Sequence, residues 1–105
     1  MKVEVYHDRH PTFTHTTRED CALPGKGTPW PDRYDRVATV QAPDGLDDAE
    51  ALEHAFAVTQ NVDAPWTEAP DVEAHGTRHR STSVGDVIVV REHIYRCEPF
   101  GWVSL

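Results

Sequence analysis

The feature that most constrains the fold is a run of four consecutive β-branched residues near the end of the sequence, Val87-Ile88-Val89-Val90. A short continuous apolar run predicts a strand that is covered on both faces. Arg91-Glu92-His93 follows as a predicted three-residue turn, and residues 94–97 return as the partner strand. Residues 98–101 have Pro second and Gly fourth, as in a type I turn, so 102–105 is predicted to be a third strand. The sequence therefore predicts a three-strand antiparallel meander within 80–105.

Two further strands and one helix are predicted upstream. Residues 3–6 alternate apolar and polar side chains, and residues 37–42 are rich in β-branched side chains. A helix over about 46–60 begins with Asp47 and Glu50 in the spacing of a capping box. Its expected apolar stripe consists of Ala49, Leu52, Ala55, Phe56 and Thr59. These elements predict a single α+β domain, in which the N-terminal strand pair and the meander form an antiparallel sheet packed on one amphipathic helix.

Two stretches lack a sustained period. Residues 8–35 contain four prolines and two glycines and are predicted to form a long loop. Its expected anchors on the core are Phe13, Leu23 and Trp30. Residues 61–82 are also predicted to be irregular, because prolines and a glycine interrupt them. Trp66 either pins this second stretch to the core or, if it is exposed, anchors a contact with a partner.

Charge is unevenly placed along the chain. The formal net charge is −8, and no Lys or Arg occurs between Arg36 and Arg78. That gap holds nine acidic residues, which disfavours nucleic acid as the partner of this block because phosphate carries the same charge. The block is either a solvated face or a binding surface for a basic protein. A small nucleic-acid-binding β module stays open as an alternative, using Arg78, Arg80, Arg91 and Arg96.

The most distinctive stretch is the bend before the apolar run, Arg80-Ser81-Thr82-Ser83-Val84-Gly85-Asp86. Gly85 can adopt a positive φ in a tight bend, and Asp86 can accept hydrogen bonds from backbone N–H groups. One interpretation is a hydrogen-bonded bend that only shapes the chain. The other is a polar binding site for an anion or a peptide backbone. Its candidate residues are Arg80, Ser81, Thr82, Ser83, Gly85 and Asp86. An enzyme that uses this pocket at 81–86 is a further alternative.

Residues 80–88, Tyr95 and Gly101-Trp102 together resemble the YodL-like family, small proteins of bacteria, plasmids and phages. The shared pattern is Arg-Ser-x-Ser-Val-Gly-Asp-Val, a hairpin, an aromatic residue and a closing pair of Gly and an aromatic residue. Residues 59–68 are similar to the segment that precedes this pattern in the family. The resemblance covers about 37–105. It implies no catalytic residues and an accessory factor of a mobile element that binds a host or element protein.

Other function classes find no support in the sequence. His75 and His79 are four residues apart, but Gly76 between them argues against a shared helix face, so no metal site and no cofactor are predicted. No motif with a catalytic mechanism is present, so the chain is not predicted to be an enzyme. It also lacks an apolar run that could span a membrane and the pattern of a signal peptide. A cytoplasmic monomer or small homo-oligomer is expected, with Cys21 and Cys97 as free thiols.

The predicted function is a non-enzymatic protein-binding factor, such as an inhibitor, that a phage or plasmid directs at a cytosolic host protein. The predicted contact face joins the acidic helix surface to the loops that follow the helix. Its candidate residues are Asp48, Glu53, Asn61, Asp63 and Trp66. Reversal of Asp48 and Glu53 to Lys is expected to abolish partner capture without lowering Tm.

Overall fold

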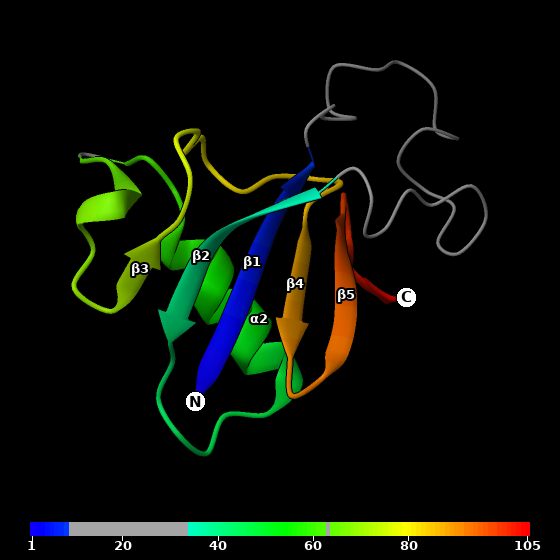
Figure 1. Cartoon of the computed structure of the whole chain (residues 1–105). Helices are drawn as coiled ribbons and strands as arrows, with labels where there is room; N and C mark the ends of the chain where they lie inside the picture. Colours follow the sequence, from blue (N-terminus) through cyan, green and yellow to red (C-terminus); the bar gives the residue numbers. More distant parts are fainter. Residues whose placement is uncertain (9–33, 63) are drawn as a thin grey trace.

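The computed structural model describes residues 1–8, 34–62 and 64–105. These residues form one six-stranded antiparallel sheet with a single α-helix against one of its faces (Figure 1). The strand order is β3-β2-β1-β4-β5-β6. The predicted α+β class, with a strand pair joined to a C-terminal meander, is confirmed.

The N-terminal strand lies in the middle of the sheet. β1 (Lys2–Asp8) pairs with β2 (Tyr34–Gln41) on one side and with β4 (Val87–Val90) on the other. Alternation along β1 places Val3 and Val5 under the helix, where both are fully buried. β1 is thus the strand that joins the N-terminal pair and the meander into one sheet.

The helix, α2 (Asp48–Val58), packs against β1 and β4 (Figure 1). Its N-cap is Asp47, and the capping box with Glu50 forms in both directions, as predicted. The helix is shorter than the predicted 46–60, because Thr59 already has the backbone of a C-cap residue. The acidic residues of the first turn lie where the helix dipole favours negative charge.

The predicted apolar stripe of α2 is partly wrong. Ala51, Leu52 and Ala55 are buried against the sheet, but Ala49 is exposed. Ala49 lies about a third of a turn away from the centre of the buried stripe, since each residue advances the helix by roughly 100°. A small residue such as alanine fits either environment, so its position in the sequence gave no decisive signal.

The C-terminal meander consists of β4, β5 (His93–Glu98) and β6 (Gly101–Ser104). Its first turn is shorter than predicted, because Val90 pairs with the first residue of β5 and leaves only Arg91 and Glu92 between the strands. Both residues have positive φ, 48° and 70°, which is the backbone of a type I′ turn. Asn-Gly and Asp-Gly are the usual sequence signals of this turn, so Arg91-Glu92 did not predict it.

The segment predicted to be irregular contains two short elements. η2 (Trp66–Glu68) is one turn of 3-10 helix, and β3 (Val72–Ala74) pairs with β2 at an edge of the sheet. Three residues give too few alternations for a strand to be recognised from sequence. Trp66 is only 2 % exposed, so it belongs to the core. The prediction that it is a contact residue is therefore wrong.

Most of the predicted 8–35 loop lies outside the described residues, as do its expected anchors Phe13, Leu23 and Trp30. The two ends of that range belong to strands instead, because β1 continues to Asp8 and β2 begins at Tyr34. Across the described ranges, no helix is long and apolar enough to cross a membrane.

Burial of β4 agrees in part with the prediction of a strand covered on both faces. Ile88 and Val90 lie on the helix side of the sheet and are fully buried. Val87 lies on the opposite face and is fully buried as well, whereas Val89 on that face is half-buried. The second face is therefore covered at one end of the strand only.

Candidate functional site

Asp86 lies at the centre of the bend before β4 and is fully buried. Arg80 donates a hydrogen bond to each of its carboxylate oxygens at 2.7 Å, as a bidentate pair. The backbone N–H groups of Ser83 and Asp8 donate to the same carboxylate at 2.7 and 2.9 Å. These donors satisfy the buried charge and join the bend to the end of β1.

A chain of hydroxyl groups connects the same bend to the helix and to β1. Thr59 donates its hydroxyl proton to the carbonyl oxygen of Ala55 at 2.8 Å. The Thr82 and Thr59 hydroxyl oxygens are 2.7 Å apart, and since the Thr59 proton is already used, Thr82 is the donor. Nε2 of His7 lies 2.8 Å from the Thr82 oxygen, so this nitrogen carries a proton and donates it. The chain of bonds therefore selects the Nε2–H tautomer of His7.

His7 is also kept neutral. Burial is the main cause that lowers the pKa of His7 from 6.5 to about 4. Asp86 opposes this shift, since its carboxylate lies 3.9 Å from Nε2, while Arg80 and His79 add to it. At neutral pH the imidazole is therefore an uncharged hydrogen-bond donor in the interior.

The predicted binding bend directs most of its polar groups inward. Its buried members are Thr82, Gly85 and Asp86, and its half-buried members are Arg80, Ser81 and Ser83. Gly85 has a φ of 94°, as expected for a tight bend, and its carbonyl accepts the Tyr34 hydroxyl at 2.7 Å. The hydroxyl oxygen of Ser81 accepts the backbone N–H of Asn61 at 2.8 Å. Of the two interpretations of this bend, these contacts favour the one in which it shapes the chain.

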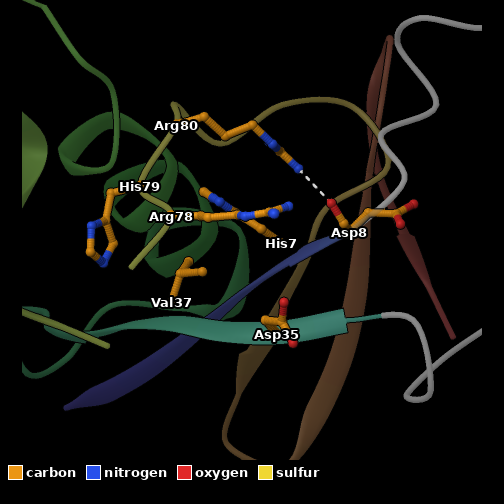
Figure 2. A pocket seen from close by; sticks show the side chains of 7 residues that line it. All are labelled: His7, Asp8, Asp35, Val37, Arg78, His79 and Arg80. Carbon is orange, nitrogen blue, oxygen red and sulfur yellow. Dashed lines mark hydrogen bonds between the residues drawn. The ribbon is translucent and has the colours of Figure 1, made fainter. Parts of the chain in front are cut away.

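A cavity of about 380 Å³ opens beside the bend (Figure 2). Its lining residues are His7, Asp8, Asp35, Val37, Arg78, His79 and Arg80. Figure 2 shows Arg80 on one side of the cavity, Asp35 of β2 on the other, and Arg78 between them. The described lining thus contains two aspartates and two arginines, one of which already binds Asp86. Among the described residues, the lining has no excess of one charge that would select an anion or a cation.

The predicted contact residues after the helix lie in different environments. Trp66 is buried, and its Nε1 donates to the carbonyl oxygen of Arg80 at 2.8 Å. Asn61 is exposed, but its side chain accepts the Trp66 backbone N–H at 3.0 Å and donates to the His79 carbonyl at 3.1 Å. Asp63 lies outside the described residues. This part of the predicted face therefore holds the chain's own loops together.

Asp48 is not a free surface charge either. It accepts hydrogen bonds from the Tyr95 hydroxyl at 2.6 Å, from Arg91 at 2.7 Å and from Nδ1 of His93 at 2.7 Å. These bonds, with that of Tyr95 first, lower the pKa of Asp48 to about 2. Arg91 also donates to the carbonyl oxygen of Leu46. Asp48 thus ties the start of α2 to the β4–β5 hairpin, and its reversal to Lys is no longer expected to leave Tm unchanged.

A further set of aromatic and acidic side chains lies on α2 and on the hairpin formed by β5 and β6. Glu53 is exposed on α2 and accepts the Nε1–H of Trp102 at 3.2 Å. Trp102 packs edge-on against Phe56 of the helix, with ring centroids 6.1 Å apart. Phe100, in the turn between β5 and β6, is 100 % exposed. We call Glu53, Phe56, Phe100 and Trp102 the hairpin-tip surface.

Sequence reasoning missed Phe100, although the signal was present. The predicted type I turn places Pro99 and Phe100 at its two central positions, and the side chains of such positions point into solvent. A large aromatic residue at that place is unusual, because turns favour small and polar residues.

The four arginines of the nucleic-acid alternative do not form one basic surface. Three of them are held by carboxylates of the chain: Arg80 by Asp86, Arg91 by Asp48 and Arg96 by Glu98. The Arg96 side chain is also only 5 % exposed. Arg78 is exposed, and among the described residues it is the one arginine of the four that has no ion pair. One such guanidinium gives little attraction for a phosphate backbone.

Cys97 is buried, and burial raises the pKa of its thiol to about 12, with Asp86 and Glu98 adding to the shift. It is a free thiol and stays protonated at neutral pH. Cys21 lies outside the described residues. Cys97 is therefore a small buried side chain with a weakly reactive sulfur.

Neither metal ligands nor similar proteins add to the interpretation of the site. Among the side chains described, no group of three His, Cys, Asp or Glu residues is placed to hold a metal ion. No family model matches the chain, and no curated protein or solved structure matches it either. The interpretation of the site therefore depends on its own geometry.

Proposed function

We propose that the chain is a non-enzymatic accessory protein of a mobile element that binds a basic protein of the host cytosol through the hairpin-tip surface. The observation that carries this proposal is Phe100, a large aromatic side chain that lies wholly in solvent on a two-residue turn. Aromatic side chains that bury on contact are frequent anchors of protein interfaces. Phe100 lies on the turn that leads into β6, two residues before Trp102, whose half-buried ring packs against Phe56.

Charge supports a basic partner. α2 contains no Lys or Arg, and Glu50 and Glu53 are both exposed on it. The acidic groups of α2 would attract a basic surface and speed its approach to the aromatic cluster. The resemblance of 37–105 to the YodL-like family supports the accessory role, since it implies binding and no catalytic residues.

Contacts in the bend at 81–86 argue against a catalytic role. The carboxylate of Asp86 and the hydroxyl of Thr82 are engaged inside the fold. A catalytic group needs a lone pair or proton that a substrate can reach.

The test is affinity capture from a bacterial lysate, followed by mass spectrometry. The wild-type chain is compared with the Phe100→Ser, Glu53→Lys double variant, which removes the anchor and reverses the adjacent charge. Glu73→Lys is the matched control, because Glu73 is an exposed acid on β3 at the other edge of the sheet. We expect wild type and Glu73→Lys to retain a protein that the double variant loses. Identical captures by all three chains would reject the proposal.

A further inference from the structure

β6 lies at an edge of the sheet. Within the described part of the chain, it pairs with β5 only. The N–H of Leu105 bonds the carbonyl of Ile94, and the register continues through Arg96 paired with Val103. Because bonding alternates along an antiparallel pair, residues 101, 103 and 105 face β5. The N–H and C=O groups of residues 102 and 104 therefore point away from the sheet.

The two edges of the sheet are not alike. β3, at the opposite edge, is three residues long, follows Pro70 and carries Glu73 at its centre. Short length, proline and charge are devices that keep an edge strand from pairing with another chain. β6 is Gly-Trp-Val-Ser and contains neither a proline nor a charge. β6 is also short, at four residues, so the two edges differ in proline and charge, and the edge that lacks both is the one beside the hairpin-tip surface.

Side chains beside β6 favour a cationic neighbour. The exposed carboxylate of Glu53 lies 3.2 Å from the indole nitrogen of Trp102, so an acid and an aromatic ring face the same space. A Lys or Arg side chain can bind such a pair through its charge and through the ring face. A second copy of the chain would bring another formal charge of −8 and another Glu53 to this edge, which disfavours it as the occupant.

We propose that an extended, basic segment of the partner protein adds to β6 as a further antiparallel or parallel strand. Its backbone binds the outward N–H and C=O groups of Trp102 and Ser104. Its side chains on the helix side place a Lys or Arg against Glu53 and Trp102, and Phe100 contacts an apolar residue at one end. This inference rests on the proposed function and specifies the chemistry of the partner.

The probe is a synthetic heptapeptide that alternates lysine and valine, added to the 15N-labelled chain. A second peptide of the same charge has proline in place of the central valine, and a third replaces lysine by glutamate. We expect the first peptide to protect the amides of Trp102 and Ser104 from hydrogen exchange and to bind about tenfold more tightly than the proline peptide. The glutamate peptide is expected not to bind, since Glu53 beside β6 would repel it.

In the protein, Ser104→Pro removes an outward donor but no bond to β5, so the chain is expected to fold and to lose the peptide. Ser104→Ala is the control and keeps binding. Equal binding of the lysine and proline peptides, or exchange protection at β3 in place of β6, would overturn the proposal. A dimer in sedimentation experiments that Ser104→Pro dissociates would also overturn it, because the occupant is then a second copy.

The two proposals fail in different ways. If Ser104→Pro still captures the lysate proteins that the Phe100→Ser, Glu53→Lys variant loses, protein binding stands and strand addition is wrong. If no captured protein depends on Phe100, the proposed function itself is wrong. If Ser104→Pro loses the same proteins as the double variant, strand addition is supported.

Discussion

Tyr95 and Asp48 meet between the sheet and the helix, with 2.6 Å between the phenolic oxygen and the carboxylate oxygen. Tyr95 belongs to β5 and Asp48 to the first turn of α2, so this bond joins the two layers of the fold. This bond is the largest of the contacts, with those of His93 and Arg91, that lower the pKa of Asp48 to about 2, and it raises the pKa of Tyr95. Since the folded pKa of Asp48 is the lower one, its contribution to stability is present above pH 3.8 and is lost as the pH falls toward 2.

Asp48→Asn is expected to lower Tm by several degrees. The amide keeps the shape of the carboxylate, but its NH2 group takes the place of one acceptor oxygen and therefore opposes either Arg91 or the donors His93 and Tyr95. Glu53→Gln is the control, because Glu53 is an exposed acid on the same helix and is expected to leave Tm unchanged. Thermal unfolding followed by circular dichroism measures both. Equal Tm values would show that the contacts of Asp48 do not stabilise the fold.

His7 makes stability depend on pH in a window from 6.5 down to about 4. The unfolded chain binds a proton in this window and the folded chain does not, so the free energy of unfolding falls as the pH falls. The total loss is roughly 3 kcal/mol by the lower limit. Urea unfolding at several pH values measures it. His7→Gln, which keeps a donor toward Thr82, should flatten the slope. An unchanged slope in His7→Gln would contradict this account.

Asp86→Asn is expected to cost about 3 kcal/mol of unfolding free energy, because it removes the buried carboxylate that accepts four hydrogen bonds and leaves the half-buried guanidinium of Arg80 without its counter-charge. Ser83→Ala is the matched control within the same bend. Ser83 binds Asp86 through its backbone N–H, which alanine retains, so a loss within about 0.5 kcal/mol is expected. Urea unfolding compares the two variants. Similar losses for both would indicate that the Ser83 hydroxyl, and not the ion pair, stabilises the bend.

Cys97 is expected to react slowly with thiol reagents in the folded chain. The pKa shift from 9.0 to about 12 reduces the thiolate fraction roughly a thousandfold, and burial adds steric protection. The measurement uses a Cys21→Ser background, so that a single thiol is present, and compares native chain with urea-unfolded chain. Rates that differ by less than tenfold would mean that the sulfur is accessible in the native state.

Glu92→Gly is expected to raise the unfolding free energy by roughly 0.5–1 kcal/mol. Glu92 has a φ of 70°, a backbone conformation that costs a non-glycine residue energy and that glycine adopts freely. Glu92→Ala is the control, because it removes the charge but keeps the unfavourable backbone. Urea unfolding of both variants separates the two causes. A gain in Glu92→Ala equal to that in Glu92→Gly would assign the effect to charge.

The elements with strong local signals were predictable from the sequence. The apolar run at 87–90, the turn at 98–101 and the capping box at Asp47 and Glu50 each depend on neighbouring residues, and each is present. β3 and the exact face of α2 that is buried were not predictable, because both depend on what the chain packs against. A three-residue strand forms here only because β2 offers it a partner.

The candidate site shows the same limit. Arg80 and Asp86 are six residues apart, and the sequence indicated that both belong to one bend. It did not indicate that the carboxylate faces inward, since this depends on Asp8 at the end of a distant strand. The sequence left Trp66 open as either a core anchor or a contact residue. Its hydrogen bond to the Arg80 carbonyl is a tertiary contact, which no local sequence pattern predicts.

The central place of β1 has a consequence for how the chain folds. Val5 of β1 pairs with Ile88 of β4, more than eighty residues later, so the middle of the sheet is complete only when β4 has been made. During synthesis the nascent chain can form the β1–β2 ladder early, but one side of β1 then remains without hydrogen-bonding partners until residues 87–90 leave the ribosome. Such a delay slows folding and exposes a strand that can pair wrongly. The stretch of translation between these two strands is therefore the interval in which aggregation is the greatest risk.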